Sequence, residues 1–443
     1  MKFSKIAASV LLALGIQAQA QGADLIEIYH AAQSQDAVFA SARASQQAGQ
    51  EKMPQGRSLL LPSVNLNANT TKNDVTTTYA AGSFLAPFGG NMKYDTYGYG
   101  VSLTQPLFRA QNWASYNEAQ LQVAITEAQF RLAEQDIILR SAQTYFDVLI
   151  AQDTVSLTAA QKTAISQQLE QAKRNFDVGT ATITDTYEAQ ARYDLILAQE
   201  LAAANDLEVK QRTLQQLINA DFGELNVLGS AFKLETPDPA DVQKWVADAQ
   251  QGNYQIIMAQ AAYQLSEQEV ARNRGGHLPT VDLVANYNKS TATGGVFGAT
   301  ETRSAAVGVQ LNMALFQGGA IQSKWREAEA NREKAKQDLE NTRRNVNLQT
   351  RQAYLGVVNG VAQVQALQQA LKSSESLLQA SKLGQQVGVR TNLDVLNAQQ
   401  QLYSTRRDLY QAQYNYLVSQ LRLKAAAGSL AEADLSRVNQ SLH

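Results

Sequence analysis

Apolar side chains recur with a helical period through a long stretch that contains almost no helix breakers. Between Arg109 and Asp221 the chain has no proline and a single glycine, Gly179. Proline and glycine are the main helix breakers, so this stretch predicts two very long helices that meet at one turn. In the first arm, a series repeating every seven residues has a companion series three or four places away, which indicates a coiled-coil seam. The first series is Ile125, Leu132, Leu139 and Phe146, and the companion is Leu121, Ala128, Ala142 and Leu149.

The same features return in the second half of the chain. The segment Phe176–Thr180 is echoed by Gln386–Val389, and Ala142–Tyr145 is echoed by Arg351–Tyr354. The segment Leu61–Val64 likewise resembles Leu278–Val281. An offset of about 209 residues between the helical landmarks indicates an internal duplication.

The second half also predicts two long helices. The first runs from Gln322 to about Leu383 with a weaker seam, and Gly356 and Gly360 within it indicate close helix contact or a bend. The last helix is more regular, because large residues every seven positions lie beside small ones and let neighbouring helices interdigitate. The weaker seam is Leu339, Val346, Ala353 and Leu367, the large residues are Val395, Leu402, Leu409, Tyr416 and Leu423, and the small ones are Ala398, Thr405, Ala412, Ser419 and Ala426.

Ahead of each long helical pair, the period changes to two. A mostly helical segment, 23–60, is interrupted by Pro54 and Gly56, and a second helical segment, 240–275, mirrors it. Each is followed by two alternating stretches joined by a loop, which predicts a long β-hairpin with one apolar and one polar face. The apolar positions are Val64, Leu66 and Ala68, then Tyr97, Tyr99, Val101 and Leu103 in the first half, and Val281, Leu283, Ala285 and Tyr287, then Val307, Val309 and Leu311 in the second.

These strands resemble transmembrane β-strands. Their polar face is small and uncharged apart from Asp282, and tyrosines and phenylalanines bound the apolar face like an aromatic girdle. An ordinary two-sheet sandwich alternates equally well and is the alternative. Four strands cannot close a membrane barrel, since the smallest need about eight, and an open edge cannot sit in lipid. If the strands span a membrane, several chains must therefore share one barrel.

The N-terminus has the pattern of a secretory signal peptide. Met1-Lys2-Phe3-Ser4-Lys5 is charged, Ile6 to Ile16 is apolar, and Ala18-Gln19-Ala20 ends in small residues, which predicts cleavage after Ala20. A buried N-terminal helix is the alternative. The expected domains are a signal peptide (1–20), a first repeat (21–221), a connector (222–250), a second repeat (251–427) and a C-terminal tail (428–443).

Composition narrows the function further. The chain has no cysteine, so disulfides, thiol chemistry and a lipid on an N-terminal cysteine are not expected. After the signal there is no apolar run long enough for a membrane-spanning helix. A net charge of −2 offers no basic face for nucleic acid. An arm from Asn112 to Asn175 would be about 95 Å long, which is of the order of the width of a cell envelope.

Several of these segments, in this order and spacing, resemble the TolC family of outer-membrane channels, more its TolC branch than its lipoprotein branch. The most specific are Asn175–Gly179 followed by Ile183–Asp185, and Val387–Thr391 followed by Asp394–Leu396. Tyr414–Leu417 and Gly275–Pro279 are similar as well. The resemblance covers essentially the whole mature chain.

The resemblance implies an α+β membrane protein. Four strands from each chain of a homotrimer would complete a 12-stranded barrel in the outer membrane of a Gram-negative bacterium. The long helices would continue it as a helical barrel in the periplasm. A periplasmic adaptor protein would link the channel to an inner-membrane transporter of the ABC or RND type. The partners expected are thus these two proteins, further copies of the chain and outer-membrane lipid.

The two glycine turns are the first candidate site. Glycine reverses the chain where a positive φ is needed, and a turn with no further role is the alternative. The resemblance implies that the turns form the periplasmic tips that meet the adaptor. We define the first tip as Val178, Gly179 and Thr180, and the second tip as Val387, Gly388 and Val389.

The residues just beyond the tips are the second candidate site. Thr182 to Asp185 and Thr391 to Asp394 both fit a capping box, which explains the two aspartates without any gate. The resemblance implies instead that Arg390 bridges to Thr184 and Asp185 on the neighbouring tip as a latch, with Gln385 where the family usually has a tyrosine. It also implies that Asp394 from each subunit rings the closed pore. Asn397 stands where this branch often has a second acid, so we expect a single-acid constriction with a weaker preference for cations.

The expected function is a passive exit duct for drugs, other small molecules or secreted proteins. No phosphate loop, nucleophile elbow or pair of acids in a cleft predicts an enzyme, and His30, His277 and His443 have no companions at metal-ligand spacing. No cofactor or metal is expected. The alternatives are a stand-alone diffusion porin and a structural or adhesive trimeric coiled coil.

Overall fold

The computed structural model describes residues 23–229, 232–296 and 298–442. The predicted signal peptide lies outside these residues. The described chain divides into two units, each assembled from separate stretches of sequence. Unit 1 takes its residues from Met1–Ala40, Glu134–Ala247 and Gln349–His443, and unit 2 consists of Ser41–Ala133 and Asp248–Leu348. Both predicted repeats contribute to each unit.

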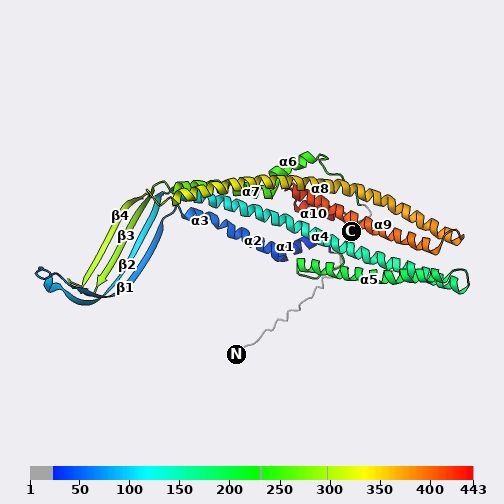
Figure 1. Cartoon of the computed structure of the whole chain (residues 1–443), viewed down its shortest axis with the longest axis horizontal. Coiled ribbons are helices and arrows are strands. Elements are labelled where there is room, and N and C mark those ends of the chain that lie inside the picture. The colour runs from blue at the N-terminus through cyan, green and yellow to red at the C-terminus, as the bar shows by residue number, and fades with distance from the viewer. Residues whose placement is uncertain (1–22, 230–231, 297, 443) are drawn as a thin grey trace, which may run out of the picture. The chain divides into compact units, whose positions relative to one another are not determined.

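Unit 2 contains a four-stranded antiparallel sheet in the order β1-β2-β3-β4 (Figure 1). The strands are β1 Ser63–Thr77, β2 Gly90–Phe108, β3 Thr280–Ala292 and β4 Thr300–Asn312, and a short 3-10 turn, η1 Ala86–Phe88, lies in the first loop. Both hairpins predicted from the alternation are confirmed. The strands extend further than predicted, because pairing continues through polar positions such as Lys72 opposite Asp95, where no apolar residue marks the period.

The register of the sheet places apolar residues on one face and polar residues on the other. Leu66 lies opposite Val101, which lies opposite Tyr287, and these form one apolar row. One residue along, Asn67, Gly100 and Asn288 form a polar row. Successive side chains of a strand point to opposite faces, so apolar and polar rows alternate in this part of the sheet. Farther along β3 and β4, the face with Leu66 also carries the charged residues Lys289, Arg303 and Glu301. The apolar face remains exposed in the single chain, with Leu66 at 73% and Val307 at 76%.

The helices of unit 2 are α3 Lys52–Ser58, α7 Tyr254–Gly275, and the parts of α2 Ala37–Gln50, α6 Val242–Gly252, α4 Ala110–Asp177 and α8 Ala320–Gln386 that belong to this unit. Helices α3 and α7 end just before a strand, and α4 and α8 begin just after one. Where β2 passes into α4, the Arg109 guanidinium forms two bonds with Asp282 of β3: Nε to Oδ1 at 2.8 Å and Nη2 to Oδ2 at 2.7 Å. This ion pair joins the first repeat to the second. Ala249, Ile256, Leu339 and Val346 form an apolar cluster farther along the helices.

Unit 1 is helical and holds the most deeply buried side chains of the described residues. It contains α1 Leu25–Gln35, α5 Ile183–Ile218, α9 Asn392–Ala426, α10 Glu432–Asn439 and the remaining parts of α2, α4, α6 and α8. The seam predicted for the last helix is confirmed, since its five large residues from Val395 to Leu423 are all buried. In α4 the companion series is the more deeply buried one, and Ala142 and Leu149 are almost fully covered. Gly360 of α8 packs against the Tyr416 ring of α9, so the close helix contact predicted at this glycine is present.

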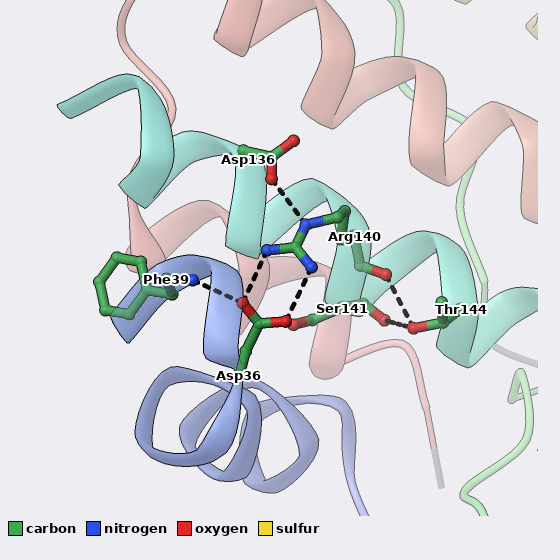
Figure 2. Close-up of polar contacts among 6 residues, drawn as sticks. All are labelled: Asp36, Phe39, Asp136, Arg140, Ser141 and Thr144. Atoms are coloured by element: carbon green, nitrogen blue, oxygen red, sulfur yellow. Dashed lines mark hydrogen bonds and ion pairs between the residues drawn. The ribbon is translucent and has the colours of Figure 1, made fainter. Parts of the chain in front are cut away.

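A buried aspartate fastens the start of unit 1 to α4 (Figure 2). Asp36 lies between α1 and α2, and its carboxylate accepts from the Phe39 backbone N–H at 2.6 Å. The Arg140 guanidinium of α4 donates to both of its oxygens, at 2.9 and 3.1 Å, and also binds Asp136 at 2.6 Å. These hydrogen bonds, above all those from Arg140, lower the pKa of Asp36.

Three details differ from the sequence predictions. Pro54 and Gly56 lie inside α3, because a proline in the first turn of a helix costs no internal hydrogen bond. The helix predicted over 240–275 is two helices, since the Asn253 side chain caps α7 by accepting from the Gln255 N–H at 2.9 Å. The segment predicted as a tail contains α10, and its Asn439 accepts from the Leu25 N–H at 3.0 Å. No described helix combines the length and the apolar character needed to cross a membrane.

Candidate functional site

The two glycine turns have the same backbone geometry. Gly179 and Gly388 have φ of 78° and 79°, in the left-handed region that favours glycine. At the first tip the Thr180 N–H donates to the Asn175 carbonyl at 2.8 Å, and at the second tip the Val389 N–H donates to Gly384 at 2.9 Å. Together with the bonds from the glycine amides, these form the Schellman motif that ends a helix. The turn prediction is confirmed in both repeats.

Valines project from the tips. Val178, Val387 and Val389 are 73%, 66% and 75% exposed. Among the described residues, no atom lies within 4 Å of a Cβ built on either glycine. Each tip of the chain therefore presents an uncovered apolar surface at the end of a helical pair.

The capping boxes predicted at the start of α5 and α9 are both present. The Thr182 backbone N–H donates to the Asp185 carboxylate at 2.9 Å, and the Asp185 N–H donates back to the Thr182 hydroxyl at 3.3 Å. Thr391 and Asp394 make the same pair of bonds, at 2.9 and 3.2 Å. The bonds from Thr391, with a smaller contribution from the charge of Arg390, lower the pKa of Asp394. Within one chain, the cap therefore keeps this carboxylate ionised.

The structure brings only part of the predicted latch together. Arg390 lies in the turn before α9, with its Nη1 3.7 Å from Oδ1 of Asp394 in the first turn of that helix, and among the described residues it makes no ion pair with Asp185. Thr184 is exposed in the first turn of α5. Gln385, at the position where the family usually has a tyrosine, donates to Asn392 Oδ1 at 3.2 Å. In the single chain, the printed partners of Arg390, Gln385 and Asp185 each lie within the same tip region as the residue itself.

The predicted second constriction position, Asn397, has a partner that the sequence did not reveal. Arg192 of α5 donates from Nη2 to Asn397 Oδ1 at 2.9 Å and from Nη1 to Gln400 Oε1 at 2.5 Å. Its counterpart in the second repeat is Gln401, which is uncharged. Comparing the two repeats position by position could have singled out Arg192.

Comparison with known proteins identifies the family to which this chain is similar. The family described as outer membrane efflux protein matches two stretches of the chain, 28–220 and 245–429. Outer membrane protein TolC of Escherichia coli K12 is 31% identical, over 97% of this chain and 87% of its own length. Alkaline protease secretion protein AprF of Pseudomonas aeruginosa is 33% identical, over 94% of this chain and 86% of its own length.

Solved structures show the same fold. The outer membrane protein VceC of Vibrio cholerae superposes with a TM-score of 0.78 at 19% identity and covers 91% of this chain and 96% of its own. The CmeC outer membrane channel of Campylobacter jejuni superposes with a TM-score of 0.79 at 15% identity. The match covers 94% of the present chain and 89% of the CmeC chain. At such identities the likeness concerns the fold, whereas the family match and the closer relatives extend over nearly the whole sequence. The chain belongs to the outer membrane efflux protein family, whose members include TolC.

Proposed function

We propose that this protein is the outer-membrane exit duct of a tripartite efflux pump or a type I secretion system. It conducts drugs, other small molecules or secreted proteins from a periplasmic adaptor and an inner-membrane transporter to the exterior. The family is one of passive channels and not of enzymes. The energy for transport must therefore come from the partner proteins.

The observation that carries the proposal is the pair of open sheet edges in unit 2. Strands β1 and β4 each have one neighbour among the described residues, so one edge of each carries unpaired backbone groups. The apolar face between them is exposed, with Val64 at 63% and Val309 at 65%. Unpaired backbone groups are too costly for lipid, so a sheet with this apolar face must close on further strands before it can span a membrane.

Identical copies can supply those strands. The sheet is antiparallel throughout and has an even number of strands, so β4 of one chain beside β1 of the next continues the alternation. Two copies would give eight strands and three would give 12, both within the range of known barrels. We propose three, as in the channels that the chain resembles. The polar face, with Asn67, Asn288 and their neighbours, would then line the interior.

We propose that the tips meet the adaptor protein. The three exposed valines of the first and second tips form an apolar surface for which the single chain has no cover. Exposed apolar patches mark sites of contact with other proteins or membranes. The transporter beyond the adaptor would be of the ABC or RND type. AprF is a protease secretion protein by name, and the cargo of the present chain could be a protein or a small molecule.

The expected domain boundaries follow as part of the same proposal. Residues 1–20 would be removed as a signal peptide, 21–221 and 251–427 would be the repeats, and 222–250 would be the connector. The segment 428–443, which contains α10, would complete the chain. We further propose that Arg390, Thr184, Asp185 and Gln385 hold the closed state, and that Asp394 and Asn397 form the constriction.

Cysteine cross-linking tests the barrel. The chain has no cysteine of its own, so Asn67→Cys on β1 can be combined in turn with a cysteine at Ser304, Ala306, Gly308 or Gln310 on β4. Oxidation in outer membranes should yield a covalent trimer for at least one pair. The control Ser102→Cys/Asn286→Cys joins register partners of β2 and β3 and should give only an intrachain disulfide. Exclusively monomeric products from every β1–β4 pair would refute the shared barrel.

A conductance and export assay separates the duct from its two alternatives. Deletion of the gene should sensitise cells to detergents or abolish secretion of a large protein, and the purified trimer should conduct weakly without its adaptor. High constitutive conductance would favour the stand-alone porin. Lost adhesion with intact export would favour the adhesive coiled coil.

A further inference from the structure

Arg192 joins α5 to α9 inside one chain. Its guanidinium spans two amide side chains of α9, with Nη2 to Asn397 Oδ1 at 2.9 Å and Nη1 to Gln400 Oε1 at 2.5 Å. Both partners are uncharged amides. In the described part of the chain Arg192 has no carboxylate within ion-pair distance, so its positive charge is not neutralised by a protein anion.

Packing behind Arg192 holds the two helices in place. An apolar cluster from three helices lies next to the amide pair and includes Leu396, the residue before Asn397. Tyr193, the residue after Arg192, packs against it. The cluster consists of Ile165, Leu169 and Ala172 of α4, Ala189 and Ile196 of α5, and Leu396 of α9. Tyr193 of α5 and Leu396 of α9, the neighbours of Arg192 and Asn397, pack in the same cluster. This packing fixes the distance that the Arg192 side chain spans between α5 and α9.

The amides that Arg192 binds share a stripe of α9 with Asp394. Asp394, Asn397 and Gln400 follow one another at intervals of three residues, so they lie on one side of the helix, with about 4.5 Å of axial rise between neighbours. Asn397 and Gln400 are exposed, whereas Val395, Leu396 and Ala398 point into the core. Two other cations of this region have their own carboxylate partners, Arg390 with Asp394 and Arg407 with Asp408.

We propose that Arg192 is a specificity-determining residue of the constriction, placing one fixed positive charge per chain beside the Asp394 ring and thereby reducing its preference for cations. This inference rests on the proposed function, in which Asp394 and Asn397 line the bore. In a trimer the three Asp394 carboxylates then lie near two sets of three guanidiniums, those of Arg390, which pair with Asp394 within each chain, and those of Arg192. Fixed charges of opposite sign that lie near one another largely cancel in their effect on a passing ion.

Ion selectivity of the purified trimer in a planar lipid bilayer tests the proposal. Reversal potentials in a KCl gradient give the ratio of potassium to chloride permeability. Arg192→Gln removes the charge and should raise this ratio about two- to fourfold, since only Arg390 then offsets the carboxylate ring. Arg192→Lys retains the charge without the planar fork and should restore a ratio close to that of the native protein.

Arg212 provides a matched control. It lies on the same helix and also donates to a glutamine, Gln215, at 2.9 Å, with Glu208 3.9 Å away. Its position along α5 is about 30 Å from that of Arg192, at about 1.5 Å of rise per residue. Arg212→Gln should leave the permeability ratio unchanged. If Arg192→Gln folds, trimerises and has the native permeability ratio, the proposal is wrong.

A double substitution distinguishes an electrostatic role from a structural one. Asn397→Asp alone would place the new carboxylate against Arg192, so it should change selectivity only modestly. Asn397→Asp combined with Arg192→Gln should raise the potassium preference by more than the product of the two single effects. Simple multiplication of the two effects would overturn the proposed compensation.

Asp394→Asn separates failure of this inference from failure of the proposed constriction. If Asp394→Asn lowers the potassium preference and Arg192→Gln leaves it unchanged, the constriction stands and the role of Arg192 falls. If neither variant alters selectivity, the constriction itself is elsewhere and both are refuted.

Discussion

Asp36 provides the sharpest stability prediction. Asp36→Asn keeps the shape of the side chain but removes the charge that Arg140 binds with two hydrogen bonds. The Asp36 side chain is 8% exposed and that of Arg140 is 32% exposed. Breaking a fully buried ion pair by removing one partner costs about 3–5 kcal/mol, and a hydrogen bond to a charged group contributes about 1.5–3 kcal/mol. Because Arg140 is partly solvated and keeps Asp136, we expect a loss of about 2–3 kcal/mol.

Hydrogen exchange followed by mass spectrometry measures this loss locally. Opening of α1 and the start of α2 should become about 30- to 140-fold more frequent, which is the factor that 2–3 kcal/mol represents at about 1.4 kcal/mol per tenfold. Asp136→Asn is the matched control, because Asp136 is 55% exposed and pairs with Arg140 only within one helix turn. Its effect should stay below about 0.5 kcal/mol. Equal protection in the two variants would refute the reasoning.

The pH dependence of the same segment has a defined sign. The folded-state pKa of Asp36 is lowered, chiefly by the hydrogen bonds from Arg140. Its stabilising contribution is therefore fully present above the unfolded pKa of about 3.9 and is lost as the pH falls through the folded value. Asp36→Asn should abolish this loss of protection in acid. A variant that retained the native acid sensitivity would show that another group titrates.

Three further predictions concern other parts of the chain. Gly388→Ala places a side chain at a positive φ, so it should destabilise the second tip by about 1–2 kcal/mol, measurable as faster local exchange. Burial raises the pKa of Asp153, whose carboxylate accepts from the Tyr414 hydroxyl at 2.9 Å. The contribution of Asp153 to native stability should therefore fall as the pH rises above about 4, and thermal unfolding of Asp153→Asn should lack this pH dependence. Asp282→Asn weakens the two bonds from Arg109, and we expect a cost of about 1.5–3 kcal/mol and less trimer in the membrane by native gel electrophoresis.

Much of the fold could be predicted because its signals are local. A helix without proline or glycine between Arg109 and Gly179 has few alternatives, and a glycine followed by a threonine capping box specifies both the end of one helix and the start of the next. The hairpins were equally visible, since alternation shows directly which side chains share a face. The ends of the strands were less predictable, because the strands go on pairing where polar residues such as Lys72 and Asp95 occupy the positions of the apolar face and the alternation stops.

The candidate site was predicted in part. The tips and caps were found because each is formed by residues within six positions of one another. Arg192 was missed, since its partners are more than 200 residues away and a lone arginine on an exposed helix face is ordinary. Any bonds from Arg390 to Thr184 and Asp185 would likewise depend on which copy of the chain supplies the neighbouring tip.

By itself, the sequence determined the helical seams, the two hairpins, the faces of the strands and the glycine turns, because all of these follow from short-range periodicity and backbone preferences. Only the tertiary structure decided that Arg140 holds Asp36, that α10 contacts the start of α1, and that Arg192 reaches Asn397. Those contacts join residues that are remote along the chain, and their partners are chosen by how whole helices pack and not by any pattern that a single segment carries.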